Sequence, residues 1–249
     1  MNSSTIATLL SLRSAWPKGA PGDMTEAQNR ADLSRMIGCD YMCFEHLRDL
    51  ILKLVSATTP EEHEPIYAHP EMKPLMQLMS NFGLVDEHYH SAVKLSSHAK
   101  RYLSGGWLEE LAWLAALEAG ADEAVYGQVV GWEYKGYIGE NEIDLIMRKG
   151  SKLTLVSCKA LKSHLGVQDR KLRNRLMDAV HETDNLADHF GRHGEKVALV
   201  VSTELFDEVR NVPRYQALMG KAAVLDVHVI ALEGIIWDRL VHTMHRLLE

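Results

Sequence analysis

Two charged residues stand where strands normally bury apolar side chains. Asp144 lies among isoleucine and leucine residues, and Lys159 closes a second, largely apolar run a short turn later in the chain. Because side chains alternate between the two faces of a strand, Glu142 shares a face with Asp144, and Ser157 shares one with Lys159. A charge at the end of a buried strand must reach water or an opposite charge. Joined by a tight hairpin, the two strands predict a small site where a divalent cation and a polarised water meet.

Hydrolysis of a phosphodiester is the chemistry that such a site suits. The reaction needs a Lewis acid on a non-bridging oxygen, a water made nucleophilic near neutral pH, and a stabilised leaving oxygen. Mg²⁺ or Mn²⁺ held by carboxylates supplies all three. A different interpretation of Asp144 and Lys159 is a buried ion pair without catalytic use, although such pairs are rarely retained for stability alone, because both charges lose their hydration.

A basic segment follows the second strand. Against the single acid Asp169 it carries six cations, namely Lys159, Lys162, Arg170, Lys171, Arg173 and Arg175. This local excess of positive charge contrasts with the net charge of -7 of the whole chain. It begins beside the predicted site, where the phosphate backbone of a nucleic acid would lie. The segment predicts a nucleic-acid-binding surface. A solvated face of an amphipathic helix is the equally acceptable alternative.

The elements that must position these residues follow from the hydrophobic periodicity after Gly106. The pattern predicts a helix over 107–119, strands over 126–134, 142–147 and 153–158, a helix over 168–190, a strand over 197–202, a helix over 214–221, a strand over 224–231 and a closing helix to 248. Residues 148–152, which include a glycine, suit a hairpin turn. A meander completed by a β-α-β crossover forms an α/β sheet with helices on both faces.

The residues before Ser104 follow a different, helical pattern. Residues 56–74 hold four of the seven prolines and indicate a connecting loop. Leu75, Leu78 and Met79 have helical spacing, Gly83 ends that helix, and residues 91–95 resemble a short strand before a second small helix. This order is typical of a winged helix. We therefore predict an N-terminal helical region over 1–103, with a winged-helix-like segment at about 74–103, and a second domain over 104–249.

The motifs resemble those of the PD-(D/E)xK nuclease superfamily, whose core has the order αβββαβ. The resemblance rests first on Asp144 followed by the hairpin and Ser157-Cys158-Lys159. Residues 104–110 (SGGWLEE), 141–144 (NEID) and 182–186 (ETDNL) further resemble the nuclease half of CRISPR-ancillary effectors that carry a CARF sensor domain. The resemblance covers about residues 74–249. It implies an α/β fold with a restriction-endonuclease-like αβββαβ core, preceded by the helical, winged-helix-like region.

The resemblance also implies roles for particular residues. Asp144 and Lys159 would be catalytic, with Asp144 as a metal ligand and Lys159 orienting the attacking water. Glu109 would be the helix carboxylate that holds a second ion or its water. The carbonyl of Cys158 is the usual additional ligand, and Gln168 stands where a glutamine often contacts the substrate. Mg²⁺ or Mn²⁺ is the implied cofactor, DNA or RNA the implied substrate, and a homodimer the usual assembly.

Ser157 departs from the family pattern, which has an acidic residue two positions before the lysine. Serine is a neutral and weak ligand for a hard cation, so the site loses metal affinity. Glu142, Glu182 and Glu110 are the acids that could compensate, and Glu110 is also an alternative to Glu109. Without compensation the chain would be a weakened or inactive nuclease fold that binds nucleic acid or acts as a regulatory interaction module.

The composition fits this class of protein. The chain has 249 residues, 46% of them hydrophobic, and three cysteines. So few cysteines, in an odd number, argue against a disulfide framework and for a reducing compartment, and no apolar run approaches the roughly 18 residues of a membrane span. We therefore expect a cytoplasmic protein without a membrane partner, and the family resemblance implies a role in prokaryotic defence. About 100 residues precede the core, too few for a CARF sensor, so we expect no sensing of a cyclic oligonucleotide by this chain.

Overall fold

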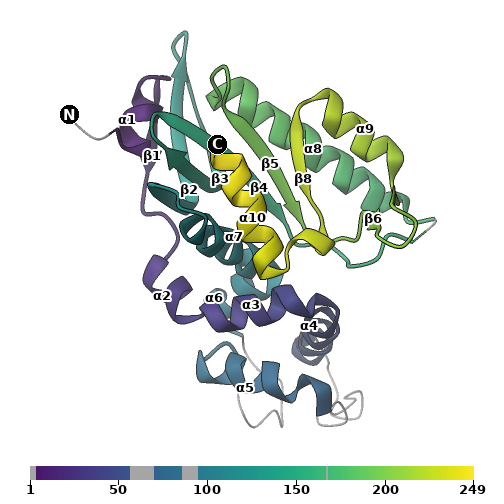
Figure 1. The fold of residues 1–249 in the computed structure, drawn as a ribbon. Coiled ribbons are helices and arrows are strands. Elements are labelled where there is room, and N and C mark those ends of the chain that lie inside the picture. The colour runs from purple at the N-terminus through teal and green to yellow at the C-terminus, as the bar shows by residue number, and fades with distance from the viewer. Residues whose placement is uncertain (1–3, 57–69, 86–94, 167) are drawn as a thin grey trace.

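A six-stranded sheet forms the centre of the molecule in the computed structural model, which describes residues 4–56, 70–85, 95–166 and 168–249 (Figure 1). In sheet order the strands are β1 (Ala15–Lys18), β2 (Glu123–Tyr134), β3 (Tyr137–Lys149), β4 (Lys152–Lys159), β5 (Lys196–Val201) and β8 (Val227–Ile230). Strands β1 to β4 pair antiparallel, whereas β5 and β8 join in parallel. Gly150 turns the β3–β4 hairpin with a φ of 59°. The predicted meander and crossover are confirmed.

Helices cover both faces of this sheet, as the sequence pattern predicts. One face carries α7 (Trp107–Glu118) and α10 (Trp237–Leu248), and the other carries α8 (Arg170–Phe190), α9 (Gln216–Val224) and α1 (Ile6–Ser11). Side chains of β3 alternate between the two hydrophobic clusters, because Leu145 and Met147 belong to the first and Ile146 belongs to the second. The sheet is therefore buried on both sides. A small separate sheet pairs β6 (Phe206–Asp207) with β7 (Val212–Pro213).

The N-terminal helices gather beyond one end of the sheet (Figure 1). They are α2 (Met24–Asn29), α3 (Ala31–Cys39), α4 (Tyr41–Ser56), the 3₁₀ turn Pro70–Met72, α5 (Lys73–Asn81) and α6 (Ser97–Arg101), and a π-helical turn over Tyr102–Gly106 joins α6 to α7. Tyr41 stacks on Trp107 with ring centroids 5.3 Å apart, and both belong to one hydrophobic cluster. Residues on both sides of position 103 thus share a core, and the division into 1–103 and 104–249 stays a prediction.

The winged-helix-like segment is described only in part. Helix α5, its end at Gly83 with a φ of 64°, and helix α6 occur where the pattern predicts them. The expected strand over 91–95 lies outside the described residues except for Leu95, so the winged helix stays a prediction. Of the expected loop over 56–74, residues 57–69 also lie outside the described residues, whereas Pro70–Met72 and the start of α5 are helical. Proline fits the first turn of a helix, which explains that difference.

One strand was not predicted, and several element bounds differ from the predicted ones. Strand β2 begins three residues before the predicted start at 126, and β3 begins five residues before the predicted start at 142. Strand β1 was not predicted, because a four-residue strand has too few positions to show alternation, and its Trp16 pairs with Gly131 of β2. Helix α9 continues through Val224, so β8 begins three residues later than predicted. Among the described helices, none is both long and apolar enough to cross a membrane.

Candidate active site

Asp144 lies at the point where β3 and β4 separate. The ladder between these strands ends at the pair Leu145 and Val156, while β4 continues alongside β5 as far as Lys159. Beyond the last pair, the main-chain N–H of Cys158 donates to Oδ2 of Asp144 at 2.6 Å in place of a ladder hydrogen bond. Burial raises the pKa of Asp144, although this hydrogen bond and the charge of Lys159 act in the opposite direction. The aspartate is therefore held at the open end of the hairpin.

Glu109 approaches Asp144 from helix α7. Burial and the charge of Asp144 raise the pKa of Glu109 to about 7, despite an ion pair with Arg101 at 3.2 Å. Gly127 of β2 makes room for this contact. It has a φ of 56°, and a Cβ at this position would lie 2.7 Å from the Arg101 guanidinium and 3.6 Å from the Glu109 carboxylate. The positive φ and the close approach of Arg101 together favour glycine here.

Arg101 is a site residue that the sequence analysis did not identify. Its guanidinium lies 3.2 Å from Glu109 and 3.7 Å from Glu142, so one cation joins carboxylates from α7 and β3. Arg101 is exposed, and it ends α6 directly before the π-helical turn. A pattern search could have found it only through its place just before the Ser-Gly-Gly motif.

Glu110, the neighbour of Glu109, serves a different contact. Its carboxylate is buried and accepts from the Arg30 side chain at 2.6 and 3.2 Å, and Arg30 also contacts His98 at 2.9 Å. Successive residues of a helix point about 100° apart, which separates the two glutamates. The structure corrects the prediction for Glu110: it is the partner of a buried arginine, and it neither replaces Glu109 nor compensates for Ser157.

A cavity of about 490 Å³ opens between the separated strands and α8. Its wall consists of Trp132, Asn141, Glu142, Asp144, Ser157, Lys159, Glu182, Asn185, Leu186, His189 and Phe190. Glu182 pairs with the Lys159 ammonium at 3.1 Å. Burial would lower the pKa of Lys159, but the hydrogen bond to Glu182 and the charge of Asp144 outweigh it and raise the pKa. Of the three acids expected to compensate for Ser157, Glu142 and Glu182 thus line the cavity.

The predicted metal ligands are all oxygen atoms, namely those of the Asp144 and Glu109 carboxylates and of the Cys158 main-chain carbonyl. Among the residues that the structure describes, no three acidic, histidine or cysteine side chains converge as a ready metal site. Asp144 and Glu109 interact closely enough for the charge of one to raise the pKa of the other, and the Cys158 main chain lies beside Asp144. Two carboxylates and one carbonyl suit Mg²⁺ or Mn²⁺, because Mg²⁺ binds oxygen and usually keeps several waters. The residues therefore fit the implied cation.

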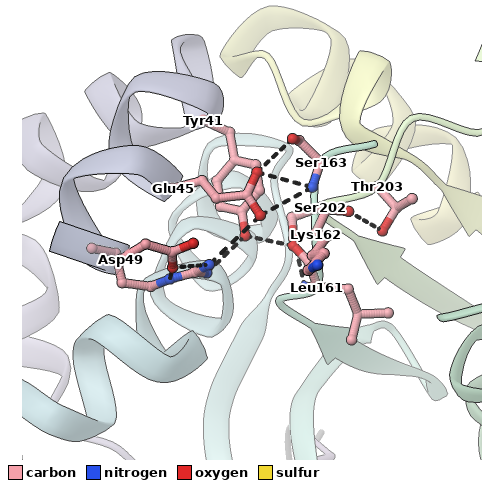
Figure 2. Close-up of polar contacts among 9 residues, drawn as sticks. Tyr41, Glu45, Asp49, Leu161, Lys162, Ser163, Ser202 and Thr203 are labelled. Atoms are coloured by element: carbon pink, nitrogen blue, oxygen red, sulfur yellow. Dashed lines mark hydrogen bonds and ion pairs between the residues drawn. The ribbon is translucent and has the colours of Figure 1, made fainter. Parts of the chain in front are cut away.

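The segment directly after Lys159 is held by helix α4 (Figure 2). Glu45 accepts from the main-chain N–H of Ser163 at 3.2 Å and from its hydroxyl at 2.5 Å. The Tyr41 hydroxyl donates to the carbonyl of Leu161 at 2.6 Å. From the other side, the Ser202 hydroxyl contacts both the N–H and the carbonyl of Leu161, at 2.7 and 2.8 Å. We call these contacts of Tyr41 and Glu45 with Leu161 and Ser163 the α4 clasp.

The predicted nucleic-acid-binding residues fall into two groups. Lys162, Gln168, Arg170, Lys171 and Arg175 are exposed. Arg173 instead is half-buried, with its guanidinium over the ring of Tyr215 at 4.8 Å, so it contributes to packing between α8 and the segment before α9. Arg175 lies seven residues before Glu182, which places it two turns away on the same face of α8.

The sheet topology and the acids and lysine at its separated strands define a PD-(D/E)xK nuclease-like domain. The chain belongs to the Card1-like endonuclease domain family, whose sequence model matches residues 96–224. The predicted resemblance to the nuclease half of CRISPR-ancillary effectors is thereby confirmed.

Two solved structures share the fold at low sequence identity. Protein VC1899 from Vibrio cholerae is 14% identical with a TM-score of 0.70, over 99% of this chain and 62% of that one. Can2 from Sulfobacillus thermosulfidooxidans, in complex with cyclic tetra-adenylate, is 14% identical with a TM-score of 0.60, over 98% of this chain and 61% of that one. The chain thus spans about three fifths of the length of these proteins. No curated protein sequence matches it.

Proposed function

We propose that the chain is a metal-dependent endonuclease that hydrolyses phosphodiester bonds of DNA or RNA in prokaryotic defence. The observation that carries the proposal is the position of Asp144, which lies where β3 and β4 separate, accepts from Cys158 and interacts electrostatically with Glu109 and Lys159. Acids from two elements and a lysine from a third therefore meet at one open strand end. This is the arrangement that phosphodiester hydrolysis needs.

Each residue has a role that its surroundings support. Asp144, Glu109 and the Cys158 carbonyl would hold Mg²⁺ or Mn²⁺, which supplies Lewis-acid activation when bound. Lys159 keeps its proton at neutral pH, because its pKa is raised above the ordinary value. Its Nζ would donate hydrogen bonds to the attacking water or to a phosphate oxygen. Glu182 holds the ammonium in place at 3.1 Å.

Cleavage assays with both kinds of nucleic acid test the proposal. Single- and double-stranded DNA and RNA are incubated with Mn²⁺ and an excess of the protein. We expect product from at least one substrate, and a strong loss of product for Lys159→Met and Glu109→Gln. Full activity of both variants would show that the residues have been assigned wrongly. Light scattering of the same preparation tests the homodimer that the resemblance implies.

A nucleic-acid-binding protein without cleavage is the second candidate, and Ser157 favours it. Ser157 lines the cavity, where an acid would add a charged ligand. If the missing acid silences the site, wild type binds nucleic acid with salt-dependent affinity and yields no product at any Mn²⁺ concentration. Ser157→Asp should then gain cleavage, whereas an active wild type excludes this candidate.

A further inference from the structure

The cavity beside Lys159 has an aromatic and amide wall that hydrolysis itself does not use. This wall consists of Trp132, Asn141, Asn185, His189 and Phe190. The side chains come from the β2–β3 hairpin and from the C-terminal half of α8. They line the same cavity as Asp144 and Lys159, so a ligand in contact with this wall lies next to the proposed reaction centre. We call these five residues the aromatic wall.

The rings of the aromatic wall are tilted against one another. Trp132 and His189 have centroids 4.3 Å apart at an interplanar angle of 65°, and His189 and Phe190 are 4.7 Å apart at 66°. At such angles the edge of one ring meets the face of the other, so the half-buried Trp132 and the exposed His189 still present ring surface, whereas Phe190 is buried behind them. Gly139, the cross-strand partner of Trp132, supports the indole: a Cβ there would lie 2.2 Å from it. The glycine therefore allows the indole to lie close to the backbone of β3.

Hydrogen-bonding groups accompany these rings. Trp132 Nε1 donates to Oδ1 of Asn141 at 2.8 Å, which leaves the amide NH₂ of Asn141 for another acceptor. Asn185 lies one turn before His189 on α8 and is exposed. Amide side chains hydrogen-bond the edges of nucleobases, and aromatic rings stack on their faces. Rings and amides together suit a flat heteroaromatic group with polar edges.

Helix α8 connects this wall to the basic segment. Arg175, Glu182 and His189 are spaced by seven residues, so they lie on one stripe of the helix at intervals of about 10.5 Å. Lys171 lies on the same stripe, one turn before Arg175. Asp178, one turn after Arg175, adds an acid to the stripe. The stripe therefore runs from two exposed cations, past the Glu182–Lys159 pair, to the ring of His189. A strand along it would meet phosphate contacts first and ring contacts last.

We propose that the aromatic wall binds a nucleobase of the substrate strand, beside the phosphate that Lys159 contacts, while Arg175 and Lys171 bind neighbouring phosphates. The base lies against Trp132 and His189, and the amides of Asn141 and Asn185 contact its edge. A base in this position is unstacked from its own strand. This assignment rests on the proposed function, because it places the base relative to the phosphate that is cleaved.

Binding without metal tests the nucleobase site. Fluorescence anisotropy in EDTA compares a 12-nucleotide oligothymidylate with an abasic backbone of equal length and equal charge. Because stacking on an aromatic side chain is sensitive to removal of the base, wild type should bind the oligothymidylate about 5- to 100-fold more tightly. Trp132→Leu and His189→Ala should lose this preference and keep the affinity for the abasic backbone. Trp132→Phe, which retains a ring, should keep most of it.

A charge variant provides the matched control. Arg175→Gln should weaken both oligonucleotides by the same factor and lower the salt dependence by about one ion. Equal affinity of wild type for the two oligonucleotides would overturn the proposal, and so would equal losses on both in His189→Ala. Circular dichroism checks the fold, and if Trp132→Leu is unfolded, the exposed His189 decides the outcome alone. Since no cleavage is required, a protein with the base preference but without product would refute hydrolysis and leave the nucleobase site intact.

Discussion

Replacing Glu45 with alanine tests whether the α4 clasp holds the segment behind Lys159. The change removes the acceptor of the Ser163 N–H, at 3.2 Å, and of the Ser163 hydroxyl, at 2.5 Å, while Ser163 stays buried. Hydrogen bonds to charged groups contribute about 1.5–3 kcal/mol each, and the Glu45 side chain is 15% exposed, so water replaces only part of the loss. We expect the free energy of unfolding to fall by about 2–3 kcal/mol, or the Tm by about 4–12 °C.

Urea unfolding and single-turnover cleavage measure the effect of Glu45→Ala. Because the Leu161–Ser163 segment directly follows Lys159, the rate should fall while substrate affinity changes little. Glu45→Gln keeps one acceptor oxygen and should recover about half of the stability. Asp49→Ala is the control on the same helix: its exposed carboxylate pairs with Arg48 at 2.8 Å, and Arg48 keeps its contacts with Tyr41 and Glu45, at 3.1 and 3.6 Å, when Asp49 is removed. Its loss should change stability by less than about 0.5 kcal/mol. Equal destabilisation by Glu45→Ala and Asp49→Ala would refute this reasoning.

Three other perturbations have defined outcomes. Gly127→Ala should slow cleavage and destabilise by roughly 1–2 kcal/mol, because alanine is strained at a φ of 56° and its Cβ shifts the Arg101 guanidinium beside Glu109; Gly136→Ala, at a φ of 84° with open space around it, should keep activity. Glu110→Gln should lower the free energy of unfolding by about 1.5–3 kcal/mol in chemical denaturation, because the buried Arg30 loses one of its two carboxylate partners and keeps only Glu26, at 2.8 Å. Mn²⁺ at about 100 times its Kd should add about 2.7 kcal/mol to the stability of wild type in thermal melts, and nothing in Asp144→Asn.

Local patterns predicted the sheet and the two strand ends of the site. The β3–β4 hairpin is short in sequence and strongly apolar, so alternation alone placed Asp144 near the end of β4. The motif family then assigned a carboxylate on α7. The motif favoured Glu109 and kept Glu110 as the alternative, because the two differ by one helix position, and in the structure the contact of Glu110 with Arg30 separates them.

Long-range contacts were beyond prediction from the sequence. Glu45 and Ser163 are 118 positions apart, and neither belongs to a motif or a periodic pattern. Arg101 contacts Glu109 and Glu142 where β2 has a glycine at position 127, and a Cβ there would lie 2.7 Å from its guanidinium. The aromatic wall likewise depends on the register that brings Gly139 opposite Trp132. These contacts depend on which helices and strands lie side by side in the fold. Hydrophobic periodicity predicts the individual elements but not their neighbours.

Single-turnover cleavage by wild type and Asp144→Asn, each with Mn²⁺ and with EDTA, tests the central claim most directly. The position of Asp144 beside Cys158, Glu109 and Lys159 predicts product from wild type with Mn²⁺, none with EDTA, and none from Asp144→Asn under either condition. Product formed by Asp144→Asn at the wild-type rate, or by wild type in EDTA, would contradict a metal-dependent nuclease centred on this residue.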